Sequence, residues 1–173
     1  HHPRWAVAYK VASDVKPSVV RSIEWSVGRT GVLTPVAVIE PVELAGAVVE
    51  RVTLHNLATL SELMCGPGSH VMVTRRGGVI PHIEDVTIKK AFKEPVVCPS
   101  CAESVVRQNR VLVHMFDIGA CRAWSVAKVN HWLKSIGVDG FGETTLTKHA
   151  VWTINDLYTS ALTVTLWEHL KKV

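Results

Sequence analysis

The sequence predicts a mixed β and α fold, in which a small Greek-key β-barrel is followed by a small cysteine-containing module and by short helices. Three observations carry this prediction. Short β-like runs separated by glycine or proline fill the first 90 residues, and a Cys-x-x-Cys pair follows at Cys98 and Cys101. The last part of the chain has helical apolar spacing around a glycine-rich turn.

The expected strands alternate apolar and polar residues, as half-buried strands do. They lie at Trp5–Val11, Arg21–Val27, Val36–Glu40, Ala47–Leu54, His70–Thr74 and Asp85–Lys89. A helix is expected at Leu57–Met64, because its apolar residues have helical spacing and Gly66-Pro67-Gly68 ends it. Short strands around one helix suit a five-stranded Greek-key barrel of the OB type, although the periodicity allows other small barrels equally.

After a linker at residues 91–97, the pattern becomes helical. A helix is expected at Ser125–Ile136 with Ser125 as its N-cap, and a second at Glu143–Val151 after the turn at Gly137–Gly142. Asn155 is expected to cap a third helix, and Leu166–Val173 is a basic, helix-like tail. We divide the chain into a tag remnant with one strand (1–12), the barrel (13–92), a zinc-finger-like module (93–124) and helix-hairpin-helix-like helices (125–173).

The composition is that of a folded, mildly basic protein. The 173 residues are 47% hydrophobic and carry a formal charge of +4, which permits a polyanionic partner without requiring one. The sequence has neither a run of eighteen apolar residues nor a signal peptide. We therefore expect a cytoplasmic protein with no membrane partner.

Four cysteines are present, and without a secretory signal a disulfide framework is a poor interpretation. The spacing of Cys98, Cys101, His114 and Cys121 suits a tetrahedral structural zinc site with three thiolates and one imidazole. Two alternatives stay open. In the first, the site has lost its metal and Met115 and Phe116 pack in its place. In the second, Cys65 or His131 supplies one of the ligands. Cys65 itself is expected to be a free thiol.

Two glycine-containing loops carry arginines that suit a phosphate partner. In Gly28-Arg29-Thr30-Gly31, the glycines allow close approach of the backbone, and the arginine can donate two hydrogen bonds to a phosphate. In the loop from Thr74 to Pro81, Arg75 and Arg76 precede Val79 and Ile80, which can press on a DNA minor groove. The purely structural alternatives are a strand-turn-strand for the first loop and core positions for Val79 and Ile80.

Together these loops resemble the NAD-dependent DNA ligase family, in which V-G-R-T-G-x-x-T-P-V-A and R-x-G-D-V-I-P segments recur in this order. The resemblance continues through Pro3–Lys10, which is similar to the last nucleotidyl-transferase motif, and extends to about Tyr158. This sequence departs from the family in having Arg76 for an alanine, Gly78 for an acidic residue and one cysteine, Cys121, where the family has a second pair.

The resemblance implies roles for individual residues. Lys10 would contact the adenylate phosphate, the structural alternative being an exposed strand lysine, and His55 and Asn56 are assigned a turn role. Gly140 and Gly142 would hold a phosphate in a helix-hairpin-helix turn, the structural alternative being an ordinary glycine turn between helices. The remaining DNA contacts would come from Arg29, Thr30, Arg75, Arg76, Val79 and Ile80.

No lysine begins the K-x-D-G motif that carries the nucleophile of such ligases. We therefore expect a DNA-binding subunit or fragment, such as a split viral or phage ligase would use, that grips nicked double-stranded DNA for a separate adenylation subunit. NAD and AMP would act through that partner. The alternatives are a stand-alone, non-enzymatic OB-fold protein that binds nucleic acid, and an interaction scaffold.

Overall fold

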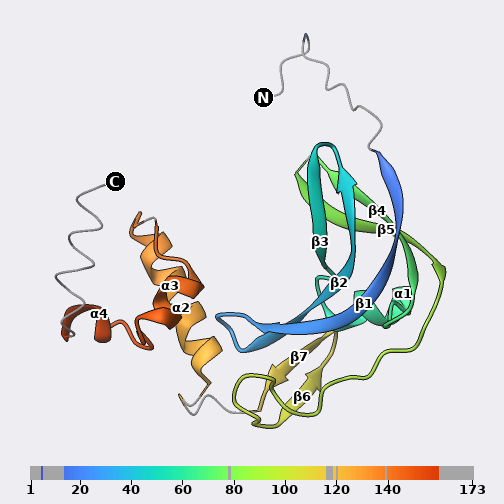
Figure 1. The fold of residues 1–173 in the computed structure, drawn as a ribbon. Helices are drawn as coiled ribbons and strands as arrows, with labels where there is room; N and C mark the ends of the chain where they lie inside the picture. Colours follow the sequence, from blue (N-terminus) through green and yellow to red (C-terminus); the bar gives the residue numbers. More distant parts are fainter. Residues whose placement is uncertain are drawn as a thin grey trace. The chain divides into compact units, whose positions relative to one another are not determined.

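The computed structural model describes residues 5, 14–77, 79–115, 119, 121–138 and 140–159. These residues form a mostly antiparallel β-sheet with a few short helices, which confirms the OB-like part of the predicted fold (Figure 1). None of the helices in these ranges has the length and apolar character needed to cross a membrane. The elements are β1 (Val15–Val27), β2 (Val32–Leu44), β3 (Ala47–Thr53), α1 (Leu57–Leu63), β4 (His70–Arg76), β5 (Ile80–Ile88), β6 (Val105–Gln108), β7 (Val111–His114), α2 (Arg122–Ser135), α3 (Glu143–Lys148) and α4 (Asp156–Thr159).

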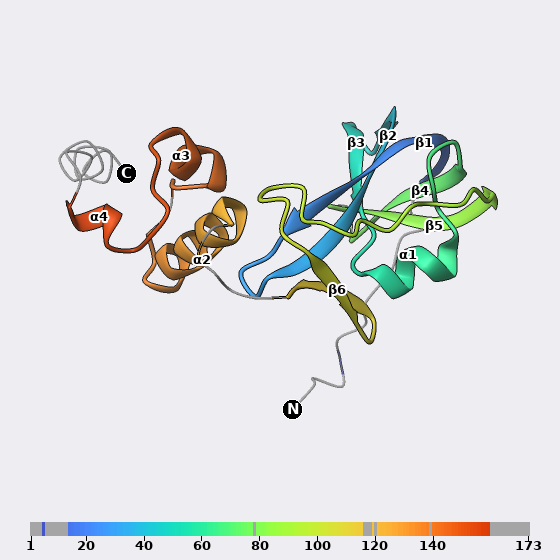
Figure 2. The ribbon, with the colours of Figure 1, turned by 90° about the horizontal axis from the view of Figure 1, so that it is seen from below.

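The sheet has the strand order β5-β4-β1-β2-β7-β6, and β3 pairs with β2. Strand β3 also contacts β5, which brings the ends of the series β3-β2-β1-β4-β5 together as in a small barrel. The long β1 and β2 strands, seen from below in Figure 2, form a hairpin that continues beyond this barrel to pair with β7. The hairpin turn therefore reaches the region of the cysteine module.

The alternation predicted for the barrel strands is clearest in β2. Its residues from Val32 to Ile39 alternate between half-buried and buried, because successive side chains of a strand point to opposite faces. Its register shifts between Val38 and Val42, where a bulge lets the strand bend toward β3. The buried apolar side chains of the strands β1 to β5, and of the residue after β3, include Val20, Val27, Leu33, Ala37, Ile39, Leu44, Val49, Val52, Leu54, Val71, Val73, Ile83 and Val86.

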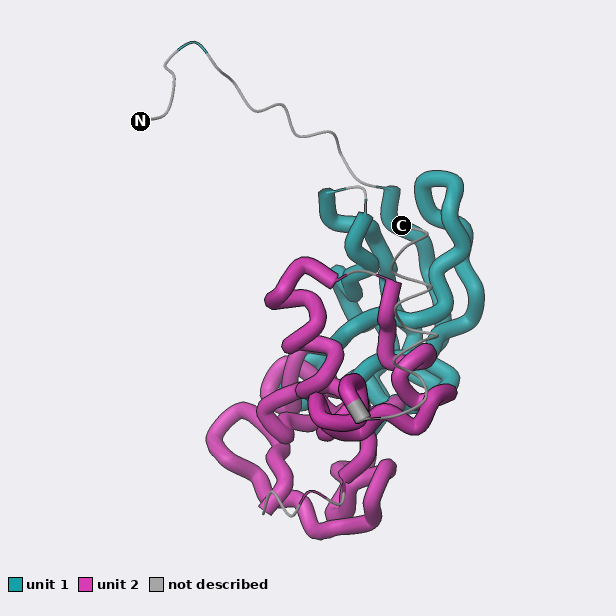
Figure 3. The backbone as a smooth tube through the Cα atoms, turned by 90° about the vertical axis from the view of Figure 1, so that its left-hand side faces the viewer, with its two compact units in different colours: residues 1–23, 36–54, 61–92 teal, residues 24–35, 55–60, 93–173 magenta. Residues whose placement is uncertain are grey.

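The chain divides into two compact units (Figure 3). Unit 1 consists of residues 1–23, 36–54 and 61–92, and its described part holds most of the barrel. Unit 2 consists of residues 24–35, 55–60 and 93–173, and its described part holds the β1–β2 turn, the cysteine module and α2 to α4. Each unit is considered by itself below.

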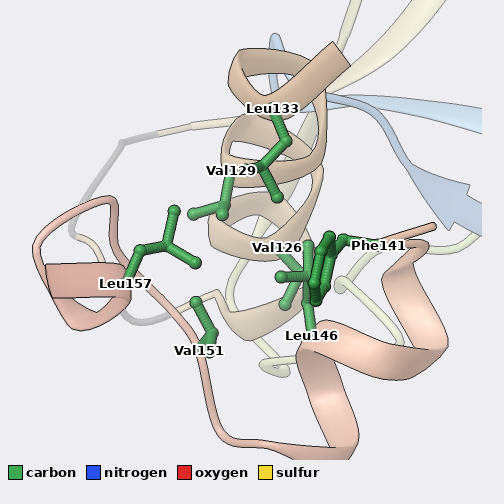
Figure 4. Close-up of a cluster of buried hydrophobic side chains, with 7 residues drawn as sticks. All are labelled: Val126, Val129, Leu133, Phe141, Leu146, Val151 and Leu157. Carbon is green, nitrogen blue, oxygen red and sulfur yellow. The ribbon is translucent and has the colours of Figure 1, made fainter. Parts of the chain in front are cut away.

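The helices of unit 2 share a small apolar core of their own (Figure 4). In Figure 4 the α2 side chains Val126, Val129 and Leu133 face the segment that follows the helix. That segment contributes Phe141, Leu146, Val151 and Leu157, and Trp132, Val138 and Trp152 pack against the cluster.

The predicted ends of these helices were wrong in two places. Helix α2 begins at Arg122 with Cys121 in the N-cap position, and the amide of Ser125 donates to the Cys121 carbonyl from inside the helix. Ser125 is therefore not the cap. Helix α3 ends at Lys148, because Ala150 adopts a positive φ of 53° and turns the chain before Val151. The expected strand after Trp5 and the tail at 166–173 lie outside the described residues.

Candidate metal centre and nucleic-acid interface

The structure brings together the four residues that the spacing selected as metal ligands. The ligand atoms of Cys98, Cys101, His114 and Cys121 all lie within 4.8 Å of one another. The Sγ atoms of Cys98 and Cys121 are 3.9 Å apart, and Cys101 Sγ lies 3.6 Å from Nε2 of His114. Three thiols and one imidazole at these separations are close enough to bind one metal ion, and such a donor set is consistent with zinc.

Three local structures present these ligands. Cys98 and Cys101 lie on a turn in which the amide of Ala102 donates to the Cys98 carbonyl, and Ala102 has a positive φ of 60°. His114 ends β7, and Cys121 precedes the first turn of α2. The β6–β7 hairpin was not expected from the sequence, and it is the element that carries the histidine into the cluster.

A hydrogen bond orients the imidazole of His114. Its Nδ1 lies 3.0 Å from the carbonyl oxygen of Gly31, and a carbonyl can only accept, so Nδ1 carries the proton that is donated. In the neutral ring the lone pair of Nε2 then faces Cys101. Metal-bound histidines are typically held in this way, with the second ring nitrogen donating to a carbonyl or carboxylate.

The cysteine thiols lie in different environments. Burial raises the pKa of Cys98 to about 11. Burial also acts to raise the pKa of Cys101, but hydrogen bonds from the Glu103 backbone, His114 and the other two cysteines outweigh it, and the net pKa lies below its usual value. A cation bound at this cluster would favour the thiolate forms of Cys98, Cys101 and Cys121.

The alternative arrangements for this module lack support within the described residues. Met115 is 50% exposed, so it does not fill an apolar core in place of a metal. His131 is exposed on α2, and Cys65 lies in unit 1 and is absent from the cluster. Burial raises the pKa of the free Cys65 thiol to about 11, as suits an inert buried cysteine. Phe116 lies outside the described residues.

The first arginine loop is a closed turn at the end of the β1–β2 hairpin. The amide of Gly31 donates to the Gly28 carbonyl over 3.0 Å, and the amide of Gly28 donates to the Val32 carbonyl over 2.8 Å. Arg29 and Thr30 are exposed at its tip. Across the described part of the chain, the Arg29 guanidinium has no ion pair or side-chain hydrogen bond, so all its donors can reach an external acceptor.

The second arginine loop joins β4 to β5. Arg75 is half-buried and donates from Nη1 to the carbonyls of Leu44 and Ala45, and from Nε to the carbonyl of Val79. Its guanidinium thus holds the β2–β3 turn and the β4–β5 turn together. Arg76 is exposed and lies 3.2 Å from Glu84.

The apolar residues of this loop point into solvent. Val79 is 69% exposed and Ile80 is 60% exposed, which excludes the interpretation of these residues as core. An open groove beside Val79 is lined by Ala47, Val48, Val49, Glu50, Arg51, Arg75, Val79 and Pro81. Its lining combines two arginines and several apolar side chains with one carboxylate, and arginines beside apolar side chains suit a phosphate backbone bordered by sugars.

Replacement of Arg75 by alanine is expected to lower the free energy of unfolding by ~1–3 kcal/mol, because the carbonyls of Leu44, Ala45 and Val79 lose a charged donor. Lysine should restore little of this, since it lacks the planar fork. Urea unfolding measures the change. The matched control is Arg76→Ala, whose exposed ion pair is worth ~0–1 kcal/mol. Equal losses for the two variants would contradict the bracing role of Arg75.

The remaining candidate residues are placed as follows. Gly140 is exposed with a positive φ of 87°, and Gly142 is the N-cap residue of α3. Asn56 caps α1 by accepting from the Thr59 amide, in keeping with the turn role assigned to it. Lys10 lies outside the described residues. Sequence reasoning missed Trp124, whose indole N–H donates to the carbonyl of Arg29 over 2.8 Å.

Comparison with known proteins gives a consistent result. Residues 17–95 match the family described as the NAD-dependent DNA ligase OB-fold domain. A DNA ligase of Sorangium cellulosum is 42% identical over 143 residues, which cover 82% of this chain and 21% of that protein. A DNA ligase of Acetivibrio thermocellus is 38% identical over 168 residues, which cover 90% of this chain and 25% of that protein. The chain spans about a fifth to a quarter of the length of these relatives.

Proposed function

Through its OB-fold domain at residues 17–95, the chain belongs to the NAD-dependent DNA ligase family, and from this premise we propose that it grips nicked duplex DNA for sealing. The observation that carries the proposal is the exposed tip of the β4–β5 loop within this domain, where Val79 and Ile80 lie beside the cations Arg75 and Arg76. The exposed guanidinium of Arg29 and the hydroxyl of Thr30 add phosphate donors. Gly140 and Gly142 offer backbone amides to a further phosphate.

The proposed cofactor of the chain is a structural zinc ion held by Cys98, Cys101, His114 and Cys121. The four donor atoms lie within 4.8 Å of one another, which is close enough to share one ion, and the carbonyl of Gly31 would be the outer partner of the histidine. The ion would fix the ends of β7 and α2 and the Cys98–Cys101 turn to one another. The proposal also divides the chain into a barrel (13–92), this zinc-finger-like module (93–124) and the helices (125–173).

The adenylation chemistry is proposed to come from a separate subunit or domain. The chain has no K-x-D-G lysine to accept AMP from NAD, so its own residues would hold DNA rather than form the covalent intermediate. Lys10 is proposed to contact the adenylate phosphate of that partner. A split ligase of this kind would work in the cytoplasm of a bacterium or of an infected host.

The test combines this chain with an adenylation subunit of an NAD-dependent ligase, NAD and a nicked duplex, and measures nick sealing on a denaturing gel. Sealing well above that of the adenylation subunit alone is expected. The matched control adds the same amount of heat-unfolded chain. Failure to increase sealing, together with equal affinity for nicked and intact duplex, would favour a stand-alone nucleic-acid-binding protein instead.

A further inference from the structure

We infer that Trp124 is a positioning residue that holds the Arg29 turn against the metal-ligand cluster, so that the grip of Arg29 on DNA depends on this tryptophan. The inference rests on the proposed role of Arg29 in DNA binding. It concerns unit 2 alone, since residues 28–31, 114 and 121–128 all belong to that unit.

The indole of Trp124 is hydrogen-bonded to the residue that it would position. Trp124 lies in the first turn of α2, three residues after the candidate ligand Cys121. Its Nε1–H donates to the carbonyl oxygen of Arg29 over 2.8 Å. Because the peptide group after Arg29 is fixed by this bond, the direction in which its side chain leaves the turn is restricted as well.

The indole ring also lies against the backbone of the turn. A Cβ atom placed on Gly31 would lie 2.7 Å from Cζ2 and Cη2 of Trp124, closer than any real contact of this kind. Gly31 also has a positive φ of 76°, which disfavours other residues. The turn thus needs glycine at this position both for its own conformation and for the tryptophan.

The same turn is held by the candidate metal ligand His114. Its backbone amide and its Nδ1 both donate to the carbonyl of Gly31, over 3.1 and 3.0 Å. The rings of His114 and Trp124 have centroids 5.0 Å apart, and Lys128 Nζ lies 4.6 Å from the centroid of the indole. The carbonyls of Arg29 and Gly31 are therefore both occupied by donors from the cluster side, while the Arg29 guanidinium points to solvent.

The experiment measures the affinity of the full chain for nicked duplex in Trp124→Phe, Arg29→Ala and the double variant. Phenylalanine keeps an aromatic ring but removes the N–H, so the affinity should fall about threefold to tenfold, the range of one hydrogen bond. The loss should disappear in the Arg29→Ala background, because Trp124 acts through Arg29. Trp132→Phe, a matched change in the same helix, should leave the affinity unchanged.

Two further measurements do not depend on DNA. The amides of Gly28 and Gly31, both hydrogen-bonded within the turn, should exchange with solvent faster in Trp124→Phe. The absorption spectrum of the Co²⁺-loaded chain should stay the same, which shows that the ligand set is intact. Unchanged amide exchange, or an equal loss of affinity with and without Arg29, would overturn the inference. If the unaltered chain fails to bind nicked DNA while the amides still exchange faster in Trp124→Phe, the proposed function is wrong, but the role of Trp124 in holding the Arg29 turn is supported.

Discussion

Replacement of His114 by alanine is expected to reduce the zinc content of the purified chain from one ion to none and to disorder the module around the cysteines. The ion would join the Cys98–Cys101 turn, β7 and the start of α2 to one another. Structural zinc contributes ~10–16 kcal/mol in small zinc-finger peptides, which far exceeds the value of any single contact here. Elemental analysis measures the zinc content, and tryptophan fluorescence reports the disorder, because the rings of Trp124 and His114 have centroids 5.0 Å apart.

The control for this experiment is His114→Cys, which supplies a fourth thiolate and should retain the ion. This variant loses the Nδ1 hydrogen bond to Gly31, so it separates the role of the ligand from that of the hydrogen bond. Treatment with a strong chelator should reproduce the alanine phenotype. A well-folded, zinc-free chain after purification without chelators would contradict the assignment of the site.

The second large effect is expected for Arg29→Ala, which should weaken binding to nicked duplex about tenfold or more, since hydrogen bonds to charged groups are worth ~1.5–3 kcal/mol. The Arg29 guanidinium is exposed and pairs with no group in the described ranges, so its removal should cost affinity and leave stability unchanged. Fluorescence anisotropy at several salt concentrations measures the affinity. The slope of log affinity against log salt concentration should decrease in magnitude by about one, which corresponds to the loss of one phosphate contact.

Arg21→Ala is the matched control for this loss of charge. Arg21 is also exposed, but its guanidinium is already bound to the Glu40 carboxylate over 2.7 and 2.8 Å. This pairing raises the pKa of Arg21 and lowers the pKa of Glu40, chiefly through the hydrogen bond between them. Arg21→Ala should therefore change DNA affinity far less. Equal losses for the two variants would show that only net charge matters.

Local patterns were sufficient to predict the barrel strands and the four side chains that form the cysteine–histidine cluster. The alternation in Val36–Glu40 marks the regular part of β2, and the Cys98, Cys101, His114 and Cys121 spacing selects side chains that do meet. The strands extend further than predicted, because β2 continues through a bulge and pairs with β7 at its start.

Features that depend on contacts between residues far apart in the chain could not be predicted from the sequence. Each strand of the β6–β7 hairpin has only four residues, too few for a clear alternating pattern. The sequence signal that could have indicated the hairpin is Asn109, which has a positive φ of 51° in the turn. Two of the three carbonyl partners of Arg75, those of Leu44 and Ala45, lie 31 and 30 residues away in the chain, and the partner of Trp124 lies 95 residues away. No periodicity within one segment encodes such pairs.

The separate apolar core of α2 to α4 has a consequence for how the chain folds. All its buried members lie between Val126 and Leu157, so this core can form from contacts that are short in sequence. The barrel instead requires β1 to pair with β4, where Val15 lies opposite Thr74. This pairing closes a long loop, which costs conformational entropy. Chains dominated by local contacts fold faster than those that close long loops. The helices should therefore gain protection early in refolding, while the barrel strands acquire it together in a slower phase.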